Sequence, residues 1–90
     1  MVSRAGEQGR FENPMAYDVM REVANRVIGR YLAWERATTG MESQRWQDER
    51  IGVRLAVRAV DPDDAGAVRE KTAELREVLR HMPDKVPVLA

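Results

Sequence analysis

The chain of 90 residues contains no cysteine and only one histidine and one phenylalanine. Without cysteine there can be no disulfide, no thiolate catalysis and no cysteine-based zinc site. A single histidine also excludes an intramolecular metal site built from several histidines. The longest apolar run, residues 31–34, is far shorter than the ~20 residues that span a bilayer, and residues 1–7 lack the apolar segment of a signal peptide. We therefore expect a cytoplasmic protein with no metal, no cofactor and no membrane association.

Neither sign of charge is in excess, since 15 basic side chains balance 15 acidic ones and the net charge is zero. Nonspecific binding to nucleic acid requires an excess of positive charge, so the composition disfavours a nucleic-acid partner. Arginine outnumbers lysine thirteen to two. Because arginine is favoured by GC-rich codons, this ratio points to a bacterial source with a GC-rich genome.

Apolar residues indicate a long first helix. The pair Asn13-Pro14 is typical of a helix start, because asparagine accepts hydrogen bonds from free amides and proline tolerates the first helical position. Gly40 suits the left-handed conformation that ends a helix. Between them the apolar residues recur at steps of three and four, as one buried face requires: Ala16, Met20, Val23, Ala24, Val27, Tyr31 and Trp34.

A second helix is predicted to follow with almost no linker. Thr39 and Glu42 have the spacing of a capping box, and Ser43 is an alternative N-cap. The apolar residues then recur at steps of seven, four and three: Trp46, Val53, Val57 and Val60. The alternation over residues 51–58 would also suit a strand. The helix is favoured because this alternation breaks at Ala56 and no second strand is available to pair with it.

The third helix has the clearest start signal in the chain. Asp61 is expected to cap it, with Pro62 at the first helical position, and Pro83 is expected to follow its end. Its apolar face is Val68, Thr72, Leu75, Leu79 and Met82.

The sequence therefore predicts an all-α fold, a three-helix bundle of long antiparallel helices in a single domain over residues 13–83. Residues 1–12 are expected to form a flexible arm, and residues 84–90 a short C-terminal tail. A bundle of this size offers little concave volume, and the chain has no glycine-rich phosphate loop and no nucleophile elbow. We therefore expect no catalytic residue and no enzymatic activity.

The charged side chains have structural interpretations. His81 is interpreted as a surface histidine at a helix C-terminus, and Asp61, Asp63 and Asp64 as helix-capping residues rather than metal ligands. Two rows of opposite charge are expected to form ion pairs between the second and third helices: Arg50, Arg54 and Arg58 with Glu70, Glu74 and Glu77. The alternative is that the arginine row binds phosphates or the acidic surface of a partner.

The first helix is the predicted contact surface. Val19, Ile28 and Leu32 widen its apolar face beyond what two neighbouring helices cover, which leaves surface for a partner. Trp34 and Trp46 are expected to meet across the first turn, and Tyr17 and Trp34 to be partly exposed near helix ends. The predicted partner-binding residues are Tyr17, Asp18, Arg21, Glu22 and Trp34.

A short chain with three helices in this order, a long first helix and no catalytic motif resembles the epsilon antitoxins of epsilon–zeta toxin–antitoxin pairs. Residues 13–22 are the part that matches the inhibitory first helix of that family. The resemblance implies a larger, nucleotide-binding partner, a zeta-type kinase toxin neutralised by steric occlusion, with Asp18 and Glu22 engaging its basic phosphate-binding residues. The alternatives are a helical DNA-binding regulator and a self-assembling scaffold, for which a homodimer is expected.

Overall fold

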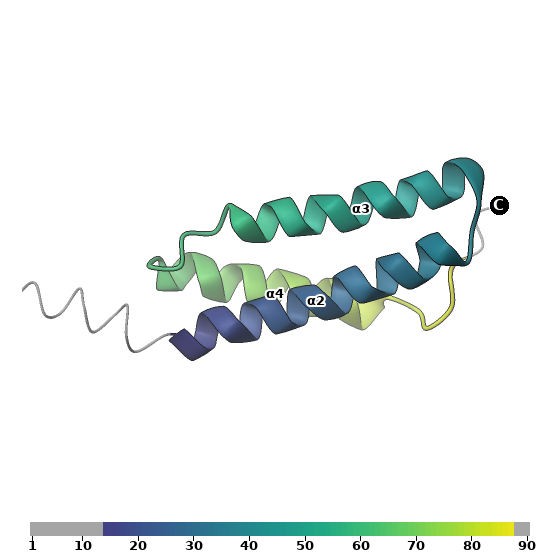
Figure 1. Ribbon diagram of the computed structural model, residues 1–90. Helices are drawn as coiled ribbons and strands as arrows, with labels where there is room; N and C mark the ends of the chain where they lie inside the picture. The colour runs from purple at the N-terminus through teal and green to yellow at the C-terminus, as the bar shows by residue number, and fades with distance from the viewer. Residues whose placement is uncertain (1–13, 88–90) are drawn as a thin grey trace, which may run out of the picture.

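The computed structural model describes residues 14–87, and in this part of the chain all regular structure is helical (Figure 1). The helices are α2 (Pro14–Arg36), α3 (Gly40–Arg58) and α4 (Ala65–His81). The predicted all-α three-helix architecture is thus confirmed, and the strand alternative for residues 51–58 is excluded because they lie in α3. The expected arm, residues 1–12, lies outside the described residues.

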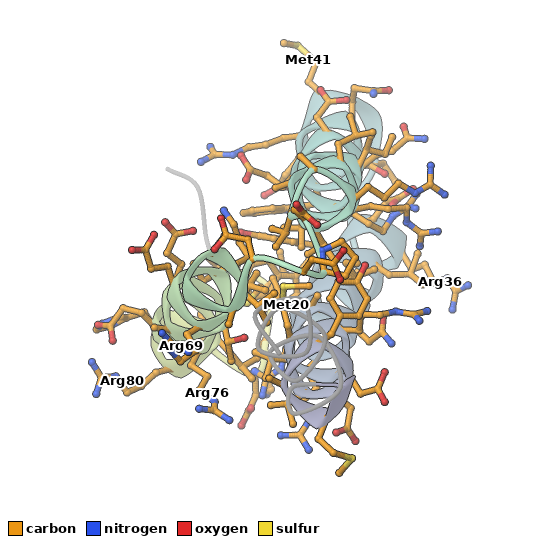
Figure 2. The ribbon with its side chains drawn as sticks, turned by 90° about the vertical axis from the view of Figure 1, so that its left-hand side faces the viewer. Met20, Arg36, Met41, Arg69, Arg76 and Arg80 are labelled. Carbon is orange, nitrogen blue, oxygen red and sulfur yellow. The ribbon has the colours of Figure 1, made fainter. Side chains whose placement is uncertain are left out.

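Helix α2 is the centre of the fold. It packs along both α3 and α4, whereas α3 and α4 approach one another at hardly any point. Viewed along the helix axes, α3 and α4 lie on two different sides of α2, and Met20 points into the space between the helices (Figure 2). Because α2 is shared by both interfaces, its apolar face supplies most of the buried cluster: Met20, Val23, Ala24 and Val27, joined by Val68 and Leu75 of α4.

The turn between α2 and α3 follows the sequence signals in part. Gly40 has φ +63°, the left-handed conformation expected for it. It is however the first residue of α3 and does not cap α2, which ends at Arg36. Thr39 occupies the N-cap position of α3, but its side chain makes no capping hydrogen bond, so the capping-box prediction is wrong. Instead, Thr38 Oγ1 donates to the Trp34 carbonyl at 2.7 Å, and Ser43 Oγ donates across the turn to the Glu35 carbonyl at 3.0 Å. Ser43 therefore joins the two helices rather than capping one.

Two glycines should respond to alanine in opposite directions. Gly29 is exposed within α2, and an added Cβ there would meet no atom, so Gly29→Ala should raise the free energy of unfolding by about 1 kcal/mol. Gly40→Ala should lower it by about 1–2 kcal/mol, because an alanine at φ +63° is strained. Urea titration of both variants followed by circular dichroism measures the difference. A stabilised Gly40→Ala variant would contradict the assigned turn.

The start of α4 differs from the prediction. Its N-cap is Asp64, whose side chain accepts a hydrogen bond from the Ala67 amide at 3.0 Å. The Asp61 carboxylate instead accepts from the Asp63 amide at 2.9 Å, which closes a turn ahead of the helix. Pro62 therefore lies in this turn and not at the first helical position. Asp61 and Asp64 are equally suitable as caps by residue type. The sequence therefore could not distinguish them, and the predicted helix start was too early.

The C-terminal end of α4 is held against α2. The helix ends at His81, ahead of Pro83 as predicted. The Arg30 guanidinium of α2 donates to the Met82 carbonyl at 3.3 Å and to the Pro83 carbonyl at 3.0 Å, and it lies 3.1 Å from the Asp84 carboxylate. One arginine of α2 thus holds the segment that follows α4, residues 82–84, against α2.

Candidate partner-binding site

Three aromatic side chains, the buried Trp34 and Trp46 and the half-buried Tyr31, form a cluster near the α2–α3 turn. The rings of Trp34 and Trp46 meet edge to face with centroids 4.8 Å apart, and Tyr31 stacks on Trp46 at 5.9 Å. Trp34 is only 4% exposed, so the expectation that it would be partly exposed is wrong. Burial, followed by the nearby charge of Glu49, raises the pKa of the Tyr31 hydroxyl. Contact of the two tryptophans across the turn is confirmed, and Trp34 belongs to the core.

A cleft of about 280 Å³ lies between α2 and α3, nearer the N-terminal half of α2. We call it the arginine cleft. Helix α2 contributes a tyrosine, an asparagine and apolar side chains to its walls, and both helices contribute arginines. The lining residues are Tyr17, Arg21, Ala24, Asn25, Ile28, Arg54, Val57 and Arg58.

The three arginines of this cleft have no acidic partner within residues 14–87. Arg21, Arg54 and Arg58 are exposed, and none of them forms an ion pair or hydrogen bond with a described residue. A guanidinium presents a planar fork of donors that matches a carboxylate. Three such groups beside one cleft can therefore bind anionic groups of another molecule.

The predicted pairing of charges between the second and third helices is wrong. Helices α3 and α4 make hardly any contact, and over residues 14–87 no ion pair joins the two rows. Arg50 instead pairs with Glu35 of α2 at 3.0 Å, and both side chains are half-buried. On α4 the pairs are local, with Glu74 bound by Lys71 at 2.6 Å and Glu77 by Arg80.

Two of the five predicted partner-binding residues line the arginine cleft, Tyr17 and Arg21. Asp18 and Glu22 are exposed on α2 but do not line it, and Trp34 is buried. Arg54 and Arg58 were not among the predicted site residues, because ion pairing with the third helix was favoured over partner binding for their row.

A signal for them was present in the antiparallel hairpin. In an antiparallel pair, each step forward along one helix matches a step backward along the other. If Trp34 lies against Trp46, residues whose numbers add up to about 80 therefore lie at the same level, and this places Arg58 beside Arg21. The missing information was the register of the two helices, which depends on the tryptophan contact.

The uncovered apolar surface lies elsewhere than expected. Val19, Ile28 and Leu32 are half-buried, so the extra apolar residues of α2 do not form a free face. The large apolar side chains exposed among the described residues lie mainly outside α2 and are Met15, Met41, Ile51, Leu55 and Val78. Helix α3 therefore carries the larger part of the exposed apolar surface.

The other candidate groups have structural roles. His81 is exposed at the end of α4 with its Nε2 2.9 Å from Glu77 Oε1. Hydrogen bonds from Arg80 and then from His81 lower the pKa of Glu77. Over residues 14–87 no group of three or more histidine or acidic side chains is placed to hold a metal ion. No helix in the same range combines the length and apolarity needed to cross a membrane.

Comparisons of this chain with protein-family models, with curated proteins and with solved structures found no match.

Proposed function

We propose that this chain is a small protein-binding module that docks on a larger partner through the arginine cleft. The observation that carries the proposal is the gathering of three arginines, Arg21, Arg54 and Arg58, at one cleft between α2 and α3, none of them paired with another described residue. Like charges held near one another cost stability unless an anion neutralises them. An acidic segment of the partner supplies that anion.

The walls of the cleft favour a protein partner over a nucleic acid. Tyr17, Ile28 and Val57 place aromatic and apolar surface beside the guanidinium groups. Tyrosine and arginine are the residue types that anchor protein interfaces. A DNA-binding helix needs a continuous row of free cations, and on α3 that row is interrupted because Arg50 is held by Glu35.

The more specific form of the proposal is a neutralising inhibitor, as the resemblance to epsilon antitoxins implies. The chain would then occlude a partner enzyme, a kinase-like toxin, by lying over its nucleotide site with α2. Asp18 and Glu22 are exposed on α2 outside the arginine cleft. They are therefore free to contact the basic side chains that such an enzyme uses to hold phosphates.

Charge reversal in the cleft tests this function. The tagged full chain is used to isolate its partner from the source cells, and the affinity of the purified partner is measured by isothermal titration calorimetry. Arg54→Glu and Arg21→Glu should each fold normally, because both side chains are exposed. Each should weaken binding by a factor of about ten or more, since a repelled charge at an interface costs ~2 kcal/mol or more.

The matched control is Arg76→Glu, a charge reversal of an exposed arginine on α4 that pairs with no residue of the described range 14–87 and lies well away from α3 (Figure 2). It should bind as the wild type does. If the partner is an enzyme, the wild-type chain should also lower its activity in proportion to occupancy, and Arg54→Glu should do so less. Unchanged affinity of both cleft variants would show that the arginine cleft is not the docking site.

A further inference from the structure

The outward face of α3 carries a regular row of exposed residues. We call it the outer row. It lies on the side of α3 opposite the buried Trp46 and the half-buried Val53 and Val57, and Met41, at the start of the helix, points away from α2 and α4 (Figure 2). The row follows steps of four, three, four and three, the spacing of one seam of a coiled coil: Gln44, Asp48, Ile51, Leu55 and Arg58.

The middle of the outer row is apolar and uncovered. Ile51 is 41% exposed and Leu55 is 58% exposed. They lie four residues apart on one helix face and therefore form a continuous apolar strip. Nothing in residues 14–87 covers this strip, although α3 packs closely on α2 through its opposite face.

The charges of the outer row are self-complementary under a two-fold axis. Ile51 and Leu55 lie equally far from Val53 along the helix, on either side of it, and so do Asp48 and Arg58. Two copies of α3 packed antiparallel about this point would place Ile51 against Leu55 of the other copy, and Asp48 against Arg58. A parallel arrangement would instead oppose like charges.

We propose that the outer row is a homodimer interface in which two α3 helices pack antiparallel. An isologous contact of this kind buries the same strip on both copies, and the two Asp48–Arg58 pairs at its ends fix its register and direction. The strip holds only two large apolar side chains per copy, so the dimer forms at micromolar concentration. Arg58 belongs to both surfaces, because it also lines the arginine cleft. Arg54 and Arg21, whose variants test docking at the cleft, lie outside the outer row.

Sedimentation equilibrium of the full chain over a range of micromolar concentrations tests the interface. The weight-average mass should rise from 10.3 kDa toward twice that value. Leu55→Glu should keep the mass at that of a monomer while its circular dichroism spectrum remains that of the wild type, because Leu55 is exposed in the folded chain.

Charge exchange tests the antiparallel register. Asp48→Arg and Arg58→Asp should each weaken dimerisation about tenfold or more. Each variant replaces both Asp48–Arg58 pairs of the symmetric contact with pairs of like charge. The double variant Asp48→Arg/Arg58→Asp should restore the dimer, and the control Arg76→Asp should leave it unchanged. A monomer at every concentration, a dimer that survives Leu55→Glu, or a double variant as weak as the single ones would each overturn the proposal.

Discussion

Replacing Val27 with aspartate should unfold the domain. Val27 is completely buried in the middle of α2, inside the apolar cluster that both α3 and α4 help to form. Arg30, three residues further along α2, could pair with the new carboxylate, but its guanidinium is already bound to the carbonyls of Met82 and Pro83. An unpaired carboxylate at this position costs several kcal/mol. A domain of this size has roughly 5–10 kcal/mol of stability in total, so the native state becomes a minor species.

Far-UV circular dichroism at neutral pH and urea titration measure this effect. The matched control is Arg26→Asp, which introduces the same side chain one residue earlier in α2 at an exposed position. It should retain the helical spectrum and a cooperative transition close to that of the wild type. If Val27→Asp unfolds with the same midpoint as Arg26→Asp, then α2 is not the centre of the core.

The apolar face of α2 was predictable because helical periodicity is a local property. Steps of three and four mark Met20, Val23 and Val27 as one face wherever the other helices pack, and all three are buried. The start of α4 was not predictable to the residue, since Asp61 and Asp64 both satisfy the requirements of a cap. Their difference lies in a turn hydrogen bond that the sequence does not reveal.

Contacts between helices were the harder part. The expected pairing of Arg54 with the glutamates of α4 assumed that the second and third helices touch. Exposed ion pairs contribute less than about 1 kcal/mol each and do not determine which helices pack together. That choice is made by the buried residues of α2, which are shared between α3 and α4. The arginine cleft follows from this arrangement, so the sequence could identify Tyr17 and Arg21 but not their neighbours on α3.

Truncating Trp46 should be the most damaging change at the other end of the bundle. Trp46 is 5% exposed and is the only buried residue of α3. Its ring contacts both Trp34 and Tyr31 of α2, so Trp46→Ala removes the contact of both side chains with α3 and leaves a cavity between the helices. Losses of about 3–5 kcal/mol are typical of such truncations. Urea denaturation should show this loss, and near-UV circular dichroism should show weaker aromatic signals.

The variant Trp46→Phe separates ring packing from hydrogen bonding. The indole N–H groups of Trp34 and Trp46 are buried and donate no hydrogen bond to a described residue. Phenylalanine keeps an aromatic ring against Trp34 and removes a donor that was unsatisfied, so its loss of stability should be clearly smaller than that of Trp46→Ala. Met41→Ala, at a position 91% exposed, provides the surface reference. A Trp46→Ala variant no less stable than Met41→Ala would mean that the aromatic cluster does not hold α3 on α2. The contact between Trp34 and Trp46 would then not determine the register of α2 and α3 that forms the arginine cleft.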